Sequence, residues 1–412
     1  MNLKILYLTY DGLTDPLGQS QVLPYLAGLS KMGYQITIIS AEKSENLKKR
    51  GEFIKSFIEK NNLKWSPLSY YKKPPVLSTY LDIRKMDREA RKLHEANKFD
   101  IVHCRSYITA LIGEGLKKRY NIKFIFDMRG FWADERVEGG IWKLKNPIYK
   151  SIYKYFKVKE KDFLTKADQT ISLTYNAKRE IKSWAGFEEV PIEVIPCCVD
   201  TELFDTEKYK IIHLEKWWKA FNIQPHELII SYLGSLGTWY LMEEVVKFCK
   251  ILKSIHKDVK FLFITQDDPK IILDKAIAQD IGRESFIFYK AERVEVPYLL
   301  KLSQASLFFV KPSYSKKASS PTRMGEILSM NIPVVCNGEV GDIEYLFENY
   351  PCGILMKDFT ENSFEEAASQ LLLLIDKMTK NPLPLRETAL SYFDLQKGID
   401  LYDGVYKKLS PF

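Results

Sequence analysis

Cysteine and histidine are scarce in this chain, and their spacing does not suit a metal site. Only six cysteines and five histidines occur among the 412 residues. The sequence contains no C-x-x-C pair and no H-E-x-x-H segment, which excludes the usual zinc spacings and a disulfide framework. We therefore expect reduced thiols, as in a cytoplasmic protein, and no bound metal.

Long hydrophobic runs are also missing. No apolar stretch approaches the roughly 18 residues that a membrane-spanning helix needs. Residues 1–10 are apolar but run into Asp11 without a small-residue cleavage site, so they predict a first strand and not a signal peptide. We expect a cytoplasmic protein, free or held peripherally on the inner face of the cell membrane.

Several catalytic signatures are absent as well. No G-x-G-x-x-G follows the first predicted strand and no P-loop occurs, which disfavours a dehydrogenase or an NTPase. The G-x-S-x-G elbow that carries a nucleophilic serine is missing. No D-x-D sequence occurs either, so metal-dependent sugar transfer by a single Rossmann domain has no support.

The composition that remains is that of an ordinary globular protein, with 46% apolar and 28% charged residues. Short apolar strands alternate with amphipathic helices in two series, which meet near residues 191–200. This alternation predicts the α/β class, with two Rossmann-like doubly wound domains facing a central cleft. We place the N-terminal domain at residues 1–192 and the C-terminal domain at residues 193–392, followed by a tyrosine-rich helix.

Charge is unevenly distributed between the two halves. Residues 1–194 contain 35 Lys and Arg and 23 Asp and Glu, which gives a net charge of +12. The remaining residues contain 26 Lys and Arg and 30 Asp and Glu, which gives −4. The first half is therefore expected to face something anionic: nucleic acid, anionic lipid or a phosphorylated substrate. Nucleic acid is the weakest of these, because no known binding module accompanies the basic residues.

Four lysines recur on one face of a predicted helix. Pro147 suits the first turn of that helix, and Lys150, Lys154, Lys157 and Lys161 follow at helical spacing. One interpretation is a solvated lysine face on a packed helix. The other is a surface that docks on an anionic membrane or a membrane-bound acceptor.

Two loops of small residues each follow the first strand of a predicted domain. The first contains Gly18 and Gln19, and the second begins with Gly234 and Ser235. Backbone N–H groups and the helix that each loop opens favour a phosphate there. The first loop could equally be an ordinary strand–helix connection with a helix cap. Loops at the two strand ends would suit a ligand with a central diphosphate.

The most informative stretch is residues 311–335, KPSYSKKASSPTRMGEILSMNIPVV. A strand ends before it, and a polar loop opens a helix that carries a glutamate one turn in. Hydroxyl and N–H groups can hold phosphate oxygens, an arginine can neutralise them, and the glutamate can accept hydrogen bonds from a ribose diol. The alternative is helix capping by Ser and Thr beside a surface glutamate. The residues concerned are Ser319, Ser320, Thr322, Arg323 and Glu326.

Several stretches together resemble one known family, the retaining glycosyltransferases of family 4, which have the GT-B fold. These stretches lie in the family's order along nearly the whole chain: ILYLTYDGLTDPLGQSQVLPYLAGLSKMGYQITIIS, FDMRGFWADERVEGGIW, VIPCCVDTELF, SYLGSLGTWY, SSPTRMGEILSMNIPVV and FDLQKGIDLYDGVYKKL. The resemblance implies a nucleotide-sugar donor in the C-terminal domain and an acceptor in the N-terminal domain. It also implies that the last helix, within residues 393–412, crosses back onto the N-terminal domain.

The resemblance also assigns residues to the donor. Gly234, Ser320 and Thr322 fall where the family holds the donor phosphates, Glu326 matches the glutamate that binds the ribose, and Gly18 matches the loop that approaches the diphosphate. A UDP or GDP sugar is the expected substrate, without cofactor or metal. Transfer with retained configuration is expected by front-face attack, in which the leaving phosphate helps to deprotonate the acceptor.

The chain departs from the family pattern at three places. Glu326 matches the second of two family glutamates, and Ala318 stands eight positions earlier, where the family has the first. Residues 235–240 carry no base, so Lys311 and Arg323 are expected to supply the missing positive charge. Phe126 stands where the family often has a histidine.

The expected catalytic residues are Glu326 and three residues of the N-terminal domain, Asp127, Arg129 and His103. Asp127 is either a contact to a sugar hydroxyl or a strand-end cap, and His103 has packing as its alternative role. The conclusion from the sequence is a glycosyltransferase that acts on a lipid-linked or surface-glycan acceptor of the polysaccharide or lipopolysaccharide kind. The alternatives are a sugar-nucleotide epimerase or hydrolase and a non-catalytic nucleotide-binding member.

Overall fold

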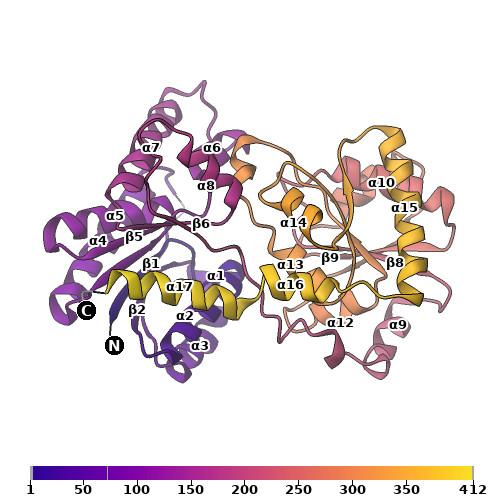
Figure 1. The fold of residues 1–412 in the computed structure, drawn as a ribbon, viewed down its shortest axis with the longest axis horizontal. Helices are drawn as coiled ribbons and strands as arrows, with labels where there is room; N and C mark the ends of the chain where they lie inside the picture. The colour runs from indigo at the N-terminus through magenta and orange to yellow at the C-terminus, as the bar shows by residue number, and fades with distance from the viewer. Residues whose placement is uncertain (1–2, 72, 411–412) are drawn as a thin grey trace. The chain divides into compact units, whose positions relative to one another are not determined.

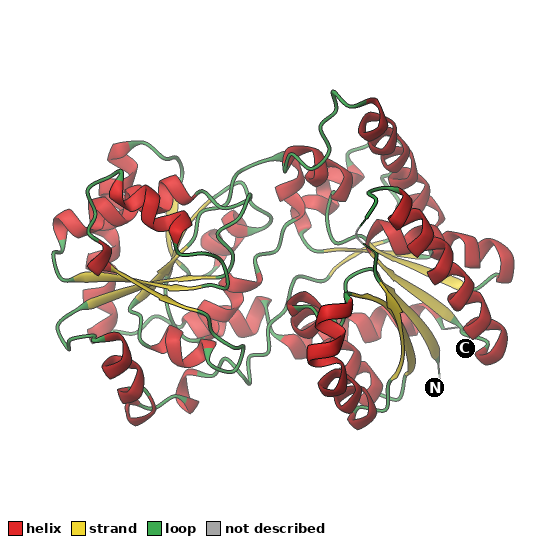
Figure 2. Cartoon of the chain, turned by 180° about the vertical axis from the view of Figure 1, so that it is seen from behind, coloured by secondary structure: helices red, strands yellow, loops and turns green. Residues whose placement is uncertain are grey.

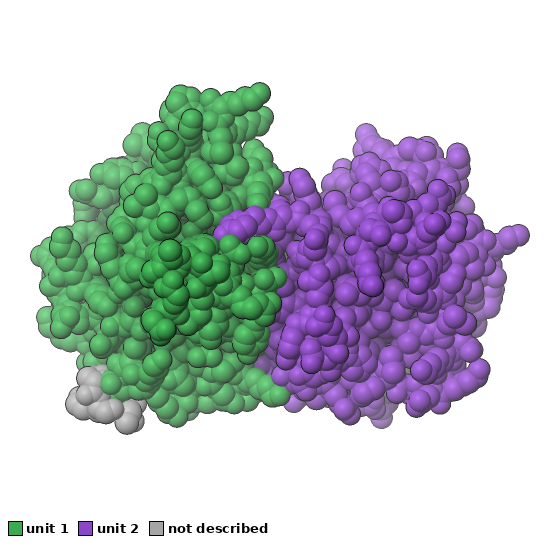
Figure 3. Space-filling view, turned by 45° about the horizontal axis from the view of Figure 1, so that its top comes forward, with its two compact units in different colours: residues 1–198, 317–319, 395–412 green, residues 199–316, 320–394 purple. Residues whose placement is uncertain are grey.

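The computed structural model describes residues 3–71 and 73–410. The chain forms two compact units (Figure 3). Unit 1 comprises residues 1–198, 317–319 and 395–412, and unit 2 comprises residues 199–316 and 320–394. Each unit is an α/β domain with helices on both faces of a parallel sheet (Figure 2). The predicted fold class, two Rossmann-like doubly wound domains, is confirmed.

The sheet of unit 1 has the order β3-β2-β1-β4-β5-β6-β7, with every described pair parallel. Its strands are β1 (Lys4–Thr9), β2 (Gln35–Glu42), β3 (Lys64–Ser69), β4 (Ile101–Arg105), β5 (Lys123–Asp127), β6 (Gln169–Ser172) and β7 (Ile192–Val194). The strand order reverses between β1 and β4. Ligands of such sheets bind at the carboxyl ends of the strands beside that reversal.

The helices of unit 1 are labelled in Figure 1. They are α1 (Pro16–Gln21), α2 (Leu23–Lys31), α3 (Ser44–Lys60), α4 (Leu77–Asn97), α5 (Ser106–Tyr120), α6 (Trp132–Glu138), α7 (Pro147–Lys166), α8 (Tyr175–Lys182) and α17 (Leu395–Leu409). α17, the last helix, packs against α2 and buries Ile399, Tyr402, Val405 and Tyr406 in the core of unit 1. It therefore belongs to unit 1, as the family resemblance implied.

The sheet of unit 2 has the order β10-β9-β8-β11-β12-β13 and reverses between β8 and β11. Its strands are β8 (Leu228–Leu233), β9 (Val259–Ile264), β10 (Phe286–Tyr289), β11 (Ala305–Leu307), β12 (Val334–Asn337) and β13 (Gly353–Met356). The first of these, β8, lies at the reversal, as β1 does in unit 1. Its residues are all buried, as a central parallel strand requires.

The α-helices of unit 2 are α9 (Glu215–Phe221), α10 (Met242–Ile255), α11 (Lys270–Ile277), α12 (Val296–Lys301), α13 (Thr322–Ser329), α14 (Ile343–Asn349), α15 (Glu361–Lys380) and α16 (Leu385–Tyr392). Short 3-10 helices are η1 (Thr206–Lys208), η2 (Ile211–His213), η3 (Arg283–Ser285) and η4 (Tyr314–Ala318). α13 follows the polar loop of the 311–335 stretch, so the sequence placed this helix correctly.

The unit boundaries differ from the predicted ones at 192/193 and 392/393. β7 begins at residue 192 and pairs with β6, which keeps the chain in unit 1 as far as Cys198. Val199 then donates a backbone hydrogen bond to the carbonyl of Phe393 at 2.7 Å, and both residues belong to unit 2. Strand pairing, which the composition of the segment does not reveal, sets these boundaries.

One strand of unit 1 escaped sequence analysis. β3 contains Pro67, which cannot donate a hydrogen bond, and such a residue usually speaks against a strand. The strand order places β3 at the sheet edge, with β2 as its neighbour. An edge strand accommodates proline because only one of its sides has to be paired.

Two glycines of α17 test how closely this helix packs in unit 1. A Cβ added at Gly398 would lie 2.7 Å from Cys198 Sγ and 2.8 Å from Tyr25 Cε1, whereas one added at Gly404 would meet nothing within 4 Å. We expect Gly398→Ala to lower the free energy of unfolding by about 1–3 kcal/mol through overpacking. Gly404→Ala, the matched control, should raise it by about 1 kcal/mol through helix propensity. Calorimetric melting of both variants measures the difference, and equal melting temperatures would contradict this packing.

Candidate functional site

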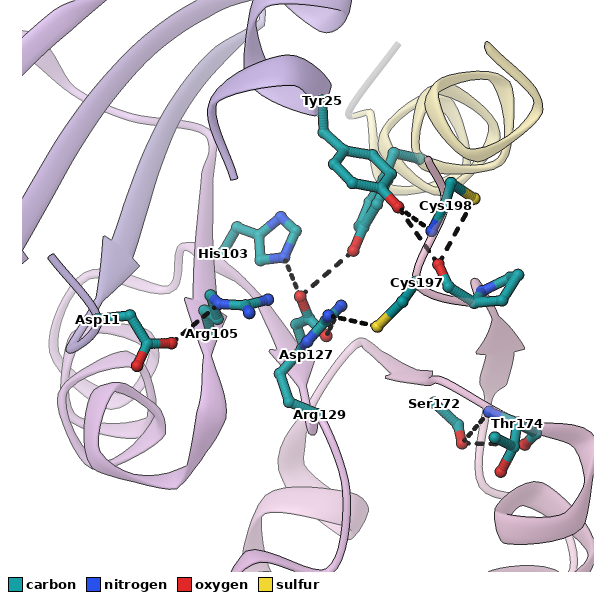
Figure 4. Close-up of polar contacts among 12 residues, drawn as sticks. Asp11, Tyr25, His103, Arg105, Asp127, Arg129, Ser172, Thr174, Cys197 and Cys198 are labelled. Carbon is teal, nitrogen blue, oxygen red and sulfur yellow. Dashed lines mark hydrogen bonds and ion pairs between the residues drawn. The ribbon is translucent and has the colours of Figure 1, made fainter. Parts of the chain in front are cut away.

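Charged side chains gather where the central strands of unit 1 end (Figure 4). His103 and Arg105 lie on β4, Asp127 is the last residue of β5, and Arg129 follows two residues later. Asp11 follows β1, the strand beside β4. Parallel strands bring these ends together, so three of the predicted catalytic residues, His103, Asp127 and Arg129, share one site.

Asp127 is completely buried, and its charge is compensated within unit 1. Its Oδ1 lies 3.8 Å from Nη1 of Arg129, and its Oδ2 accepts a hydrogen bond from the Tyr402 hydroxyl of α17 at 3.3 Å. Burial by itself would raise the pKa of this carboxyl. The charge of Arg129 and the neighbouring His103 and Arg105 outweigh burial and lower the pKa of Asp127 below its ordinary value. The side chain is therefore an ionised acceptor and no longer only a strand-end cap.

His103 is held between that carboxylate and a tyrosine of α17. Its Nδ1 lies 2.8 Å from the Tyr406 hydroxyl, and its Nε2 faces Asp127 Oδ2 at 3.5 Å. Burial lowers the pKa of His103, although Asp127 opposes the shift. The ring is thus neutral at pH 7. Because Nε2 faces an anion, we assign the proton to Nε2 and an acceptor role to Nδ1.

The backbone after β5 is locally strained. Arg129 has a φ of +58° and Gly130 a φ of +127°. Left-handed backbone is uncommon for a residue with a side chain, and it turns the guanidinium of Arg129 back toward Asp127. A Cβ added at Gly130 would lie 3.7 Å from Cβ of Ala318. Ala318 is itself buried in unit 1, so the position that the family fills with a glutamate here carries a methyl group.

The first predicted phosphate loop is occupied by a side chain of the protein. The Glu42 carboxylate, fully buried at the end of β2, accepts hydrogen bonds from the backbone N–H groups of Leu13 at 2.6 Å and Thr14 at 3.2 Å. A Cβ at Gly18 would lie 2.2 Å from the carbonyl oxygen of Gly12, so Gly18 is needed for the loop to close on itself. Gln19 donates to the carbonyl of Thr14 at 3.1 Å. Two backbone N–H groups of the loop that was expected to favour a phosphate are therefore taken by Glu42, and the roles of Gly18 and Gln19 toward a ligand stay predictions.

In unit 2, Gly234 and Arg323 meet at the carboxyl end of β8. Gly234 has a φ of +108°, and a Cβ added there would lie 2.6 Å from Nη2 of Arg323. The guanidinium is buried and stacks on Tyr240, with its carbon 4.1 Å from the ring centre. Burial opposes its charge, yet the neighbouring Tyr232 and Tyr240 favour it and raise the pKa of Arg323. Its Nη1 has no hydrogen-bond partner among the described residues.

Ser235 and the following amide are held by an acidic residue. Asp267 accepts hydrogen bonds from the Ser235 hydroxyl at 2.9 Å and from the Leu236 N–H at 2.6 Å. A carboxylate thus occupies part of the second small-residue loop, just as Glu42 occupies the first. Asp267 was not predicted from the sequence.

Glu326 lies in the second turn of α13 and is 7% exposed. Its Oε1 accepts from Nη1 of Arg293 at 2.8 Å. α13 has Pro321 at its N-cap position and no side-chain cap. The alternative of a capped helix with a surface glutamate is therefore wrong. One carboxylate oxygen is fixed by Arg293, which leaves Oε2 to accept from a ligand.

The remaining predicted donor residues are divided between the units. Ser319 belongs to unit 1, Ser320 and Thr322 to unit 2, and all three are half-buried. Lys311 is exposed, and its backbone N–H bonds to the carbonyl of Trp239. Lys316 is the more buried lysine, with its Nζ 3.8 Å from the ring centre of that same Trp239.

Three of the four lysines predicted to form an exposed face of α7 are exposed, and Lys157 is not. Lys157 is half-buried and bonds to Asp134 at 2.8 Å and Glu160 at 2.5 Å. Lys150, Lys154 and Lys161 are exposed. Exposed apolar side chains accompany them on α7, namely Ile148, Tyr155 and Val158 at 60%, 48% and 62% exposure. The surface is therefore a mixture of cationic and apolar groups.

Four functional candidates were missed by the sequence analysis: Arg105, Arg293, Lys316 and Tyr402. A signal existed only for Arg105, since a charged residue that directly ends an apolar strand is unusual. The others depend on which helix or loop packs beside the site.

Within residues 3–71 and 73–410, no group of three or more His, Cys, Asp or Glu could hold a metal ion. In the same part of the chain, no helix is long and apolar enough to cross a bilayer.

Comparison with known proteins finds one family profile that matches part of the chain, and several solved structures with a similar fold. The profile of Glycosyltransferase Family 4 matches residues 19–203. No curated protein matches the chain significantly. Similar solved structures include a glycosyltransferase from Rickettsia africae, with 15% identity, 99% and 98% of the two chains covered and a TM-score of 0.70. Sucrose-phosphate synthase from Thermosynechococcus elongatus has 13% identity, 99% coverage of both chains and a TM-score of 0.74.

The HepE protein of Anabaena, solved with UDP and glucose, has 13% identity, 100% coverage of both chains and a TM-score of 0.67. At these identities the structural likeness shows the fold, the two Rossmann-like domains of GT-B glycosyltransferases. Together with the profile match, it supports a family 4-like glycosyltransferase.

The burial of neutral His103 predicts a pH dependence of stability. Its pKa is lower in the folded chain than in the unfolded one, so the unfolded state binds an extra proton as the pH falls below about 6.5. The wild type should therefore lose up to about 1.4 kcal/mol of stability per pH unit there, and regain it above that pH.

The measurement is urea unfolding at about pH 7.5 and about pH 5.5. His103→Gln should flatten the slope, and His226→Gln, at an exposed histidine, is the matched control. An equal slope in the wild type and His103→Gln would show that His103 is not buried as a neutral ring.

Proposed function

We propose that this protein transfers a sugar from a nucleoside-diphosphate sugar to a lipid-linked or surface-glycan acceptor, with retention of anomeric configuration. The observation that carries the proposal is the arrangement at the end of β8. A left-handed glycine lets the backbone come close to a ligand, and the buried guanidinium of Arg323 beside it keeps an unpartnered N–H. The profile match over residues 19–203 and the UDP found in HepE support the same substrate class.

The donor is proposed to lie along α13 and the loop after β8. Arg323 would take the diphosphate, and Lys316 is a second cation on the same loop through its contact with Trp239. Glu326, already oriented by Arg293, would accept from the ribose hydroxyls. Two protein cations supply the charge that a metal ion would otherwise provide, so we propose transfer without a metal.

The reaction needs one bond made and one broken at the anomeric carbon. The acceptor oxygen bonds to that carbon on the face from which the diphosphate leaves, and the acceptor proton passes to the leaving phosphate oxygen. Negative charge grows on the diphosphate during this step. Preorganised cations at that point are usually the largest contribution to such catalysis. In unit 1, Asp127 is proposed to orient an acceptor hydroxyl, with Arg129 and His103 holding the carboxylate in place.

A panel of nucleotides tests the donor class. We expect UDP or GDP to raise the melting temperature in EDTA as well as in Mg²⁺, because a ligand that binds only the folded state stabilises it, by about 2.7 kcal/mol at a hundredfold excess over its Kd. ADP and CMP serve as comparisons. Glu326→Ala should weaken the active nucleotide about ten- to a hundredfold, the value of a hydrogen bond to a charged group. Glu365→Ala on α15 is the exposed control.

Unchanged affinity in Glu326→Ala would remove the site assignment. A lack of response to all four nucleotides would remove the proposed substrate class. If a nucleotide sugar is consumed without any acceptor, the enzyme is a hydrolase or epimerase. If it binds and is never consumed, the protein is a non-catalytic nucleotide-binding member.

We further propose that the exposed face of α7 rests on an anionic membrane, where the acceptor would be found. Each lysine near such a surface contributes about 1 kcal/mol, and the apolar side chains beside them can enter the headgroup layer. Changing Lys150, Lys154 and Lys161 to Glu should release the protein from anionic vesicles in a sedimentation assay. The control changes Lys247, Lys250 and Lys257, three exposed lysines of unit 2, in the same way. Equal release of both triple variants from the vesicles would show that the net charge of the protein drives binding, and the proposed role of α7 would be wrong.

A further inference from the structure

The charged cluster of unit 1 is incompletely bonded. Three buried polar atoms have no hydrogen-bond partner among the described residues: Arg105 Nη1, His103 Nε2 and Asp127 Oδ1. More than nine in ten buried polar groups in proteins do have a partner. His103 Nε2 faces Asp127 Oδ2 at 3.5 Å. Arg105 Nη1 and Asp127 Oδ1, at the ends of neighbouring strands, therefore indicate a ligand that supplies the missing bonds.

The ion pairs of the two arginines in the cluster are long. Arg105 reaches Asp11 through Nε at 3.2 Å, and Arg129 approaches Asp127 at 3.8 Å. Charge-assisted hydrogen bonds between such groups are ordinarily about 2.7–2.9 Å, which is shorter than both of these contacts. Figure 4 shows the Arg105 guanidinium extending from β4 toward Asp127 and Arg129, with its Nε turned to Asp11. The two guanidiniums therefore share counter-charges that hold neither of them tightly.

The position of Arg105 makes its unpartnered N–H unusual. The side chain is 3% exposed, whereas its partner Asp11 is 44% exposed. Beside its long ion pair with Asp127, Arg129 donates from Nη2 to the thiol of Cys197, a weak acceptor, at 3.2 Å. Two buried arginines thus face one another with one buried carboxylate between them, and an added anion would relieve the repulsion of their charges.

The unpartnered atoms specify the chemistry of the ligand. Arginine N–H groups prefer the oxygens of phosphate, which they can hold with two parallel bonds. Asp127 Oδ1 is an acceptor and requires a hydroxyl. The missing ligand therefore carries an anionic oxygen and a hydroxyl close together, as a sugar phosphate does.

We propose that Arg105 and Arg129 bind a phosphate ester of the acceptor, beside the hydroxyl that Asp127 receives. The inference rests on the proposed function, in which unit 1 takes the acceptor, and it makes that acceptor a phosphorylated sugar. In this proposal Arg105 binds the phosphate, and Asp127 binds the reacting hydroxyl.

Equilibrium binding of glucose 1-phosphate, followed by its ³¹P signal, tests the proposal without requiring turnover. Glucose and inorganic phosphate are the two comparison probes. The wild type should bind glucose 1-phosphate more tightly than either, because each comparison probe lacks one of the two groups. Arg105→Gln should weaken the sugar phosphate about ten- to a hundredfold, the value of hydrogen bonds to a charged group.

A second variant guards against simple misfolding of Arg105→Gln. Asp11→Asn removes the exposed carboxylate that neutralises Arg105, so it should bind glucose 1-phosphate more tightly than the wild type. Loss of folding cannot produce a gain in affinity. Glu45→Gln, at an exposed carboxylate of α3, is the matched control and should bind like the wild type.

The competing outcomes are separate. No binding of glucose 1-phosphate by the wild type at millimolar concentration, or equal binding by Arg105→Gln, would overturn the phosphate site. UDP is measured on the same variants: if Arg105→Gln weakens UDP and leaves glucose 1-phosphate unchanged, Arg105 serves the donor and the proposal is wrong. If neither the wild type nor any variant binds UDP, while glucose 1-phosphate binds to each of them as expected, the proposed function fails and the phosphate site stands.

Discussion

An ionised carboxylate without access to water has to be compensated inside the protein, and much of unit 1 is arranged around that requirement. Asp127 ends the central strand β5, where it has no solvent contact. Leaving such a charge unpaired would cost several kcal/mol, so neighbouring elements must each contribute a partner. β4 contributes His103 and Arg105, the strained turn after β5 contributes Arg129, and α17 contributes Tyr402. The C-terminal helix is thereby fixed to the site by polar bonds as well as by its apolar face.

Unit 2 contains a buried cation, the guanidinium of Arg323, whose charge also has to be stabilised. Arg323 lies beneath the loop after β8, and the faces of Tyr240, Tyr232 and Phe308 surround its guanidinium. Aromatic faces attract a cation, and Nη1 of Arg323 keeps no hydrogen-bond partner among the described residues. The resulting site keeps positive charge available at the end of a strand. Gly234 is required there because any side chain would displace the guanidinium.

Both small-residue loops already hold an anion, and in both cases it is a carboxylate of the protein. Glu42 takes the amides of residues 13 and 14, and Asp267 takes the amide of Leu236 together with the Ser235 hydroxyl. Clustered N–H groups attract negative charge whatever its source. The sequence pattern therefore identified the electrostatic character of the loops correctly but not their occupant. A phosphate at the second loop would have to share its donors with Asp267.

The sequence by itself determined the fold class and the positions of most strands and helices, because buried parallel strands require apolar runs and helices require their own periodicity. It also predicted Arg323 and Glu326 as donor residues, from one polar loop between a strand and a helix, and Gly234, from the small-residue loop that follows the strand at 228–233. It could not reveal that Lys157 is paired with Asp134, that β3 forms an edge with Pro67, or that Arg293 orients Glu326. The partners in each of these interactions are brought together by packing. Arg105, Asp127 and Tyr402 are far apart in the chain, and only the tertiary structure decided that one buried carboxylate would bring them into a single site.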